Sequence, residues 1–372
     1  MKRFNLYFLM AALAVFSVSC TTDDSDDGNS PDESGSQNFK RQTMLEDVAD
    51  RQIIPSYQRL ETDLQTLQES VVNLRDSPNE TNLEDAREAL HKARLTSQKA
   101  SFFEFGPAAQ QQLRQNLLAW PADSQAIDKA IDDQNAGLGD FNAEKRSLAA
   151  LEYLLFFPKN SDQWVQSANE TPYRMAFANS VIDKLRSRVE TVLNGWTVDG
   201  GNYRDRFVNE LEGSSRGSAL SLLTNEFTYS YEQVKTAKVR IPAGLYPGND
   251  AALPEQVEAL YSRRSLDYAN AALDATADVY NGTHYGEDAG QGFADYLRFL
   301  GEEELVVETN EQFQQVRDAV NAIDGSLYEA VEAQPDVVKT AFEKLQGQVR
   351  FYKTDMTSVT GVTINYADND GD

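Results

Sequence analysis

The stretch IIPSYQRLETDLQTLQESVVNL, residues 53–74, decides the fold of the chain. Its large apolar side chains recur at spacings of three and four residues, which places them on one face of an α-helix. They are Ile53, Ile54, Tyr57, Leu60, Leu64, Leu67, Val71 and Leu74. Pro55 lies inside this pattern. Because proline has no backbone N–H to donate to the preceding turn, we expect the helix to kink or to restart there.

The same helical period continues from residue 38 along almost the whole chain, and alternating strand patterns are nearly absent. Further helices are expected over residues 81–106, 108–119, 123–133, 144–156, 172–193, 220–236, 254–280, 302–323 and 335–356, and residues 360–366 are expected to be extended. The glycine-bearing stretch 195–203 is the clearest break between two groups of long helices. The sequence therefore predicts an all-α fold of two packed, four-helix-bundle-like halves with a cleft between them.

Domain boundaries follow from that break. The first helical bundle is expected over residues 38–197, a linker over 198–216, and the second bundle, with an extended acidic C-terminus, over 217–372.

The N-terminus has the features of a bacterial lipoprotein signal. Lys2 and Arg3 precede an apolar run over residues 6–18. That run is too short to span a bilayer and has the length of a signal-peptide core. The only cysteine of the chain, Cys20, follows it. We expect residues 1–19 to be removed and Cys20 to carry lipid, with an ordinary secretory signal as the alternative.

Residues 20–37 are expected to form an acidic, disordered tether. The segment contains six acidic residues, no basic residue and no large apolar residue, so it cannot bury enough surface to order itself. The acid cluster either resembles the signal that sends lipoproteins to the outer face of the outer membrane in Bacteroidota or is a simple spacer. The expected location is the cell envelope, on the surface or the periplasmic face of the outer membrane.

Composition excludes several classes of function. The chain has 34 Lys and Arg against 59 Asp and Glu, a net charge of −25, which argues against nucleic-acid binding because phosphate contacts need a basic face. One Cys and two His rule out an intrachain disulfide and a zinc finger. Any metal site must therefore depend mainly on carboxylates.

An ordered series of short motifs resembles the imelysins, the M75 peptidase family. The motifs are IIPSYQRL (53–60), FEFGP (103–107), WPAD (120–123), LEYLLF (151–156), NGW (194–196) and NYADNDGD (365–372). The resemblance covers most of residues 40–372. It implies an all-helical protein of two bundles with a functional cleft between them, exported, linked to iron uptake and sometimes described as a metallopeptidase.

The family signature Gly-x-His-x-x-Glu falls on residues 147–152, and only its glutamate is kept. Ser147 stands for the glycine, Ala149 stands for the histidine, and Glu152 matches. A His and a Glu three residues apart lie on one helical face and could hold one ion together. Replacing the imidazole by a methyl group removes a metal bond, so the sequence argues against peptidase chemistry.

Other candidate residues are weaker. The resemblance implies an acid where Ser101 stands, and Glu104 lies one helical turn away. If Glu152 is buried it needs a partner, for which Arg146 and Arg174 are the basic candidates in the sequence. Neither His91 nor His284 has a neighbour that completes a ligand pair.

A basic island over residues 235–249 is unusual in so acidic a chain. It either lines the cleft and holds an anionic ligand, contacts membrane or surface glycan, or is an irregular connection between helices. Arg263 is a second basic candidate for the cleft. The acidic end of the chain, 368–372, has the oxygen spacing of half a calcium loop. The cofactor is unknown, with a divalent ion (Fe, Zn or Ca) as the candidate and Glu152 as its ligand.

These observations predict a monomeric, lipid-anchored, imelysin-like binding protein rather than an enzyme. Its ligand site is expected to involve Glu152, Ser147, Glu104 and Arg263. Its ligand would be a metal, a metal complex or a partner protein of iron uptake. A metallopeptidase of the imelysin type and a surface polysaccharide-binding lipoprotein are the alternatives.

Overall fold

The computed structural model describes residues 33–366 except 140, 212, 247 and 250. The signal peptide, Cys20, most of the tether and the acidic segment 368–372 therefore lie outside the described residues. The predicted all-α class is confirmed, because the described residues contain only one pair of two-residue strands, β1 (Thr283–His284) and β2 (Glu287–Asp288), which pair antiparallel. Among the described residues, no helix combines the length and the apolar character needed to cross a membrane.

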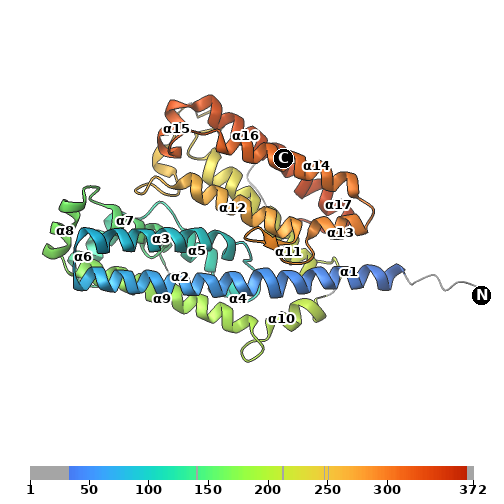
Figure 1. Cartoon of the computed structure of the whole chain (residues 1–372), viewed down its shortest axis with the longest axis horizontal. Coiled ribbons are helices and arrows are strands. Elements are labelled where there is room, and N and C mark those ends of the chain that lie inside the picture. Colours follow the sequence, from blue (N-terminus) through green and yellow to red (C-terminus); the bar gives the residue numbers. More distant parts are fainter. Residues whose placement is uncertain (1–32, 140, 212, 247, 250, 367–372) are drawn as a thin grey trace, which may run out of the picture.

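Long helices form one layer of the molecule, the lower layer in Figure 1. They are α1 (Glu33–Val48), α2 (Ile54–Asp76), α3 (Glu80–Ala100) and α9 (Tyr173–Trp196). α2 packs between α3 and α9. The apolar face of residues 53–74 is buried as predicted, with Leu60, Leu64, Leu67 and Val71 fully buried. α1 includes residues 33–37, which we expected in the tether.

At Pro55, where the sequence predicts a kink or a restart, the helix changes from a π-helical to an α-helical turn. A π-helical turn, η1 (Ala49–Ile53), leads directly into α2, and Pro55 lies in the first turn of α2. Ile53 and Ile54 keep helical backbone conformations, and the Ile54 N–H donates to the Ala49 carbonyl five residues earlier. The chain thus continues in the helical direction, and the wider π-helical turn lies just before the residue that has no N–H to donate.

Short helices complete the lower layer. They are α4 (Pro107–Gln111), α5 (Leu113–Leu118), α6 (Ser124–Asp132), η2 (Ala143–Lys145), α7 (Leu148–Phe156), α8 (Ser161–Glu170), α10 (Tyr203–Asp205) and η3 (Arg206–Glu210). The single helix expected over 108–119 is divided, because Gln112 adopts a left-handed conformation between α4 and α5. Gly106 makes the tight turn before α4 with a φ of 55°, and a Cβ there would lie 2.4 Å from the Tyr203 ring.

The rest of the chain forms the upper layer in Figure 1. Its elements are α11 (Ala219–Gln233), η4 (Val234–Arg240), η5 (Pro254–Gln256), α12 (Ser265–Asn281), α13 (Phe293–Phe299), α14 (Glu303–Asn321), α15 (Leu327–Ala333), α16 (Pro335–Arg350), η6 (Phe351–Met356) and α17 (Thr357–Thr360). The helix expected over 254–280 begins only at Ser265. Residues 257–264 form an irregular loop in which Arg263 has a φ of 64°, a conformation that interrupts a helix.

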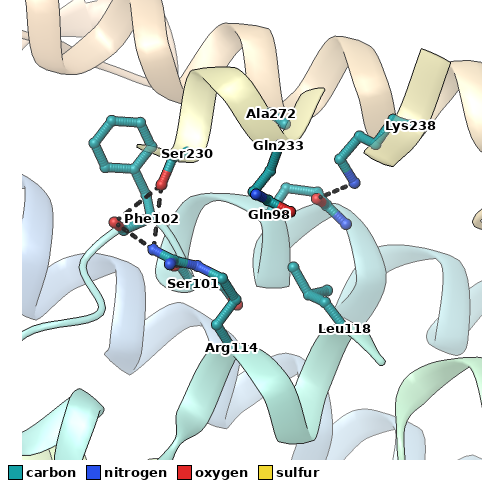
Figure 2. Close-up of a pocket in the computed structure, with 9 residues that line it drawn as sticks. All are labelled: Gln98, Ser101, Phe102, Arg114, Leu118, Ser230, Gln233, Lys238 and Ala272. Carbon is teal, nitrogen blue, oxygen red and sulfur yellow. Dashed lines mark hydrogen bonds between the residues drawn. The ribbon is translucent and has the colours of Figure 1, made fainter. Parts of the chain in front are cut away.

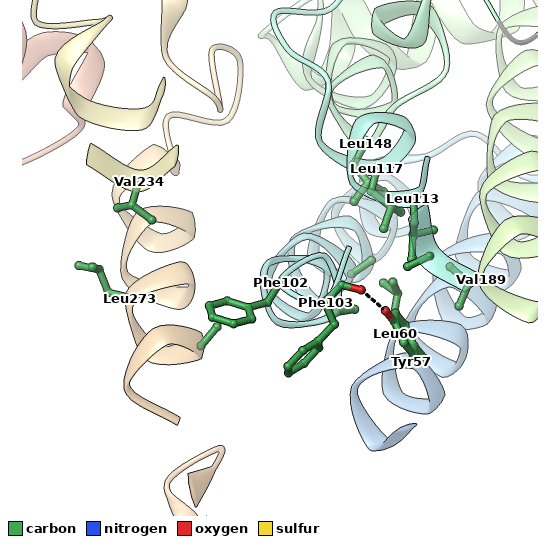
Figure 3. Close-up of a cluster of buried hydrophobic side chains, with 14 of the residues drawn as sticks. Tyr57, Leu60, Phe102, Phe103, Leu113, Leu117, Leu148, Val189, Val234 and Leu273 are labelled. Atoms are coloured by element: carbon green, nitrogen blue, oxygen red, sulfur yellow. Dashed lines mark hydrogen bonds between the residues drawn. The ribbon is translucent and has the colours of Figure 1, made fainter. Parts of the chain in front are cut away.

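The two layers meet along α3, which packs on α12. Phe102, just after α3, lies towards Leu273 and Val234 of the upper layer (Figure 3) and makes an edge contact with Phe227 at 5.9 Å between ring centroids. The neighbouring Phe103 carbonyl accepts a 3.0 Å hydrogen bond from the Tyr57 hydroxyl of α2. One buried hydrophobic cluster therefore extends through both layers, and polar side chains beside it form the candidate site.

Candidate functional site

Residues 147–152, on which the family signature is predicted to fall, lie at the start of α7. Ser147 is the N-cap of this helix, with an extended backbone and a hydroxyl that accepts a hydrogen bond from the Ala150 N–H at 3.3 Å. This cap explains why the helix begins at residue 148 rather than at the expected 144. Ala149 and Glu152 are both buried, and only 1% of the Glu152 surface is exposed.

Both oxygens of the Glu152 carboxylate are occupied by partners within the protein. Oε2 accepts a 2.6 Å hydrogen bond from Arg94 of α3. Oε1 accepts from the backbone N–H of Ser262 at 2.7 Å and from its hydroxyl at 2.5 Å. Since an isolated buried carboxylate is very costly, these three charge-assisted bonds account for how Glu152 is tolerated in the interior.

The partner that we expected for Glu152 is different in the structure. Arg146 donates instead to Asn116 at 2.9 Å and to the Phe141 carbonyl. Arg174 donates to backbone carbonyls at the end of α7. Glu152 and Arg94 are 58 positions apart in the sequence. Their contact depends on how α3 packs against α7, which local spacing does not reveal.

A second buried carboxylate, Glu258, extends this arrangement into the upper layer. Arg94 donates to the Glu258 carbonyl at 3.0 Å and lies 3.6 Å from its carboxylate. Gln98 donates to the same carboxylate at 2.9 Å, and Lys238 of η4 donates both to it and to the Gln98 amide oxygen. We call Arg94, Gln98, Glu152, Lys238, Glu258 and Ser262 the Arg94 network.

The Arg94 network is electrically neutral, with two cations and two carboxylates. Burial raises the pKa of Glu258, but Lys238 and Arg94 outweigh that effect and hold it below its ordinary value. Burial lowers the pKa of Arg94, and the attraction of Glu152, Tyr268 and Glu258 more than reverses this. Both groups therefore remain charged near neutral pH and lock α3, α7 and η4 together.

The donors around Glu152 do not fit a metal ion. The residue one turn before it is Ala149, which has no ligand atom, and both carboxylate oxygens already accept from Arg94 and Ser262. No group of three or more His, Cys, Asp or Glu residues in the described part of the chain could hold a metal. Glu152 as a metal ligand stays a prediction, and the geometry around it argues for an ion pair instead.

A cavity of about 420 Å³, which we call the outer hollow, adjoins the Arg94 network through Lys238. It is lined by Glu104, Arg114, Gln115, Leu118, Ala119, Trp120, Tyr229, Gln233 and Lys238. Two cation–π pairs form part of its wall: the Lys238 ammonium lies 5.1 Å from the Trp120 ring centre, and the Arg114 guanidinium lies 5.0 Å from that of Tyr229. The volume is in the range of small-molecule sites.

Glu104 lies in this hollow and not beside Glu152. Its Oε2 accepts a hydrogen bond from the Arg114 backbone N–H at 2.9 Å. Burial raises the pKa of Glu104 to about 7; Arg114 lowers it, and the nearby Glu226 raises it further. The Arg114 guanidinium is held by Glu226 at 2.6 Å and by the Ser101 carbonyl at 2.9 Å.

The remaining predicted residues are dispersed. Arg263 follows Ser262 in the loop, but its guanidinium lies 3.3 Å from the ring centre of Tyr328 and 3.8 Å from Glu329, and it lines neither the network nor the hollow. His91 contacts the Tyr268 hydroxyl at 3.2 Å. Of the basic island, Lys238 lines the outer hollow, and the island's role in ligand binding stays a prediction.

Sequence reasoning missed Arg94, Gln98, Glu258 and Arg114. A signal was available in part: residues 96–99 are polar, continue an apolar helical face, and are all buried in the structure. A polar run at the end of an amphipathic helix is usually solvated, so this pattern alone does not predict burial on both faces of α3.

Comparison with known proteins identifies the class. The family model Imelysin (Peptidase_M75) matches residues 53–352, so the chain belongs to the imelysin family. No curated protein sequence matches the chain.

Two solved structures have the same fold. A protein of Parabacteroides distasonis, assigned as an iron-regulated protein A precursor, superposes with a TM-score of 0.73 at 18% identity, covering 91% of this chain and 98% of that one. An imelysin-like protein of Psychrobacter arcticum superposes with a TM-score of 0.70 at 15% identity, covering 88% of this chain and 98% of that one. At these identities the likeness concerns the fold alone.

The Arg94–Glu152 pair can be tested by unfolding in urea. Arg94→Met leaves Glu152 without its cation, and we expect a loss of roughly 3–5 kcal/mol in the free energy of unfolding. The double variant Arg94→Met/Glu152→Gln removes both charges and should recover a large part of that loss. The control is Arg264→Met, whose partner Glu88 is 3.9 Å away on the surface and which should cost less than about 1 kcal/mol. Equal losses in the single and double variants would contradict the pairing.

Glu104 predicts a pH dependence of stability. Its ordinary pKa is 4.5 and its folded value is about 7, so between these values the folded state binds more protons than the unfolded state. The free energy of unfolding should therefore fall as pH rises through this window. Glu104→Gln removes the effect, and urea unfolding at a series of pH values should show the variant gaining on the parent until about pH 7 and then running parallel to it. Parallel profiles throughout would refute the assignment.

Proposed function

We propose that this imelysin is a lipid-anchored binding protein of the cell envelope that captures a ligand in the outer hollow and serves iron uptake without peptidase activity. The observation that supports it is the occupation of both Glu152 oxygens by Arg94 and Ser262. Lipid on Cys20 would hold the folded body at the outer membrane.

The Arg94 network argues against hydrolysis. A metallopeptidase needs an ion with about three protein ligands, an open coordination position and a base. An ion at Glu152 would have to displace the Arg94 guanidinium, which would then remain buried beside the ion without its 2.6 Å partner. Arg94 would keep only the Glu258 carboxylate, 3.6 Å away, and breaking a buried pair costs roughly 3–5 kcal/mol, so a bare metal ion is a poor ligand for this site.

The outer hollow supports capture of a small molecule. Its volume of about 420 Å³ and its mixed aromatic and polar wall suit a compact ligand such as a metal complex, whereas a polysaccharide needs an extended open groove. The link to iron rests on the imelysin family and on the similarity in fold to a protein assigned as iron-regulated. A partner protein of iron uptake could accept the ligand from this hollow.

The proposal is tested by radioactive iron uptake under iron limitation. Cells that lack the chain should take up less iron, and the parent chain should restore uptake, whereas Cys20→Ala should be released from the membrane fraction and restore it poorly. Unchanged uptake without the chain would overturn the iron link. In parallel, the purified mature chain should show no zinc-dependent hydrolysis of casein; hydrolysis that Glu152→Ala abolishes would establish the metallopeptidase alternative.

A further inference from the structure

A second, smaller cavity lies deeper between the layers and adjoins the outer hollow. Its volume is about 40 Å³, and we call it the inner chamber. It is lined by Gln98, Ser101, Phe102, Arg114, Leu118, Ser230, Gln233, Lys238 and Ala272 (Figure 2). Arg114, Leu118, Gln233 and Lys238 line both cavities. The chamber can therefore accept one end of a ligand whose other end lies in the outer hollow.

Two basic side chains line the inner chamber. Arg114 and Lys238 approach it from opposite sides in Figure 2, and none of its lining residues is an Asp or a Glu. This is unusual in a chain with a net charge of −25. The carboxylates that pair with the two cations, Glu226 and Glu258, do not line the chamber.

A buried hydroxyl without a partner also lines the chamber. Ser101 is 2% exposed, and its Oγ makes no hydrogen bond within the described residues. The Gln98 amide, by contrast, is fully used, since it donates to Glu258 and accepts from Lys238. A buried polar atom without a partner costs free energy, so the Ser101 hydroxyl is available to donate to a bound acceptor.

The size and the balance of charge restrict the bound group. A volume of about 40 Å³ is more than the roughly 10–15 Å³ that a cavity needs to hold one water molecule, so it has room for a small polar group. Because Arg114 and Lys238 each already have one carboxylate partner, the chamber has little positive charge to spare and cannot balance several negative charges.

The outer hollow provides the place for an apolar body. Leu118, Ala119, Trp120 and Tyr229 contribute apolar and aromatic surface there, and Glu104 is the only acid in its lining. An ionised Glu104 would repel a second negative charge on the ligand, which again favours a monoanion.

We propose that the inner chamber binds the carboxylate of a small organic acid, between Arg114, Lys238 and the Ser101 hydroxyl, and that the apolar body of the acid lies in the outer hollow. This inference rests on the proposed function, because it names the class of ligand that the binding protein captures. The bound carboxylate would also be the anionic ligand that the sequence predicts for the basic island, with Lys238 as the residue that contacts it.

The test compares three probes that share one body and differ in the terminal group: 3-phenylpropionate, 3-phenylpropionamide and 3-phenylpropylamine. Each is titrated into the mature chain by calorimetry at constant pH. The acid should bind, the amide should bind at least about tenfold more weakly because a charged hydrogen bond is lost, and the amine should not bind. No binding of the acid, or equal binding of acid and amide, would overturn the proposal; water alone in the chamber would give that result.

A pair of serine variants locates the site. Ser101→Ala removes the unpartnered hydroxyl and should lower the affinity for the acid by about three- to tenfold, while its melting temperature stays equal to that of the parent or rises. The control is Ser97→Ala, one helical turn earlier in α3, whose hydroxyl donates to the Arg94 carbonyl at 2.7 Å and does not line the chamber; it should bind the acid as the parent does. Unchanged affinity in Ser101→Ala would place the acid elsewhere.

The two proposals fail separately. If the acid does not bind but iron uptake depends on the chain, the carboxylate inference is wrong and the proposed function stands. If the acid binds in the chamber but uptake is independent of the chain, the ligand class is supported and the role in iron uptake is wrong.

Discussion

The buried ion pair between Arg94 and Glu152 is the interaction on which the site depends. It joins α3 to α7, and through Glu258 and Ser262 it also fixes the irregular loop that precedes α12. A buried pair of this kind adds little net stability, since desolvation offsets most of the attraction, but breaking it leaves a costly isolated charge. The pair therefore constrains how α3, α7 and the loop can be arranged and keeps the cavities between the layers in shape.

This constraint explains how Glu152 can be buried although Ala149, one turn before it, offers no polar side-chain atom. The charge of Glu152 requires a positive partner whether or not an ion is present. In this chain the guanidinium of Arg94 provides that charge, and the Ser262 amide and hydroxyl satisfy the other oxygen. Glu152 is thus part of the buried framework, and the two cavities lined by Arg114 and Lys238 lie beside it.

Much of the fold could be predicted from the sequence because helical faces are local patterns. The spacing of Leu60, Leu64 and Leu67 fixed the buried face of α2, and Pro55 marked its first turn. Local patterns predicted the wrong secondary structure where a contact between distant residues decides whether a segment is a helix or a loop. The loop over 257–264 carries an apolar pattern like a helix, yet it is irregular, and its Ser262 N–H donates to Glu152 across 110 positions.

The candidate site was predicted only in part for the same reason. Glu152 and Lys238 could be singled out, the first by the signature and the second by its basic surroundings. Arg94 lies 58 positions from Glu152, and Glu258 lies 20 positions from Lys238. Local spacing therefore reveals neither pair, and these residues became candidates only once the structure showed that they are buried together. Glu104 was found for its position near Ser101, but its raised pKa of about 7 comes from burial, which composition does not reveal.

The most direct test of the central claim is anomalous X-ray scattering from crystals of the mature chain grown with zinc and, separately, with ferrous iron. The account predicts no anomalous peak at the Glu152 carboxylate, which should still accept from Arg94 and Ser262. A peak coordinated by Glu152, with Arg94 displaced, would contradict it.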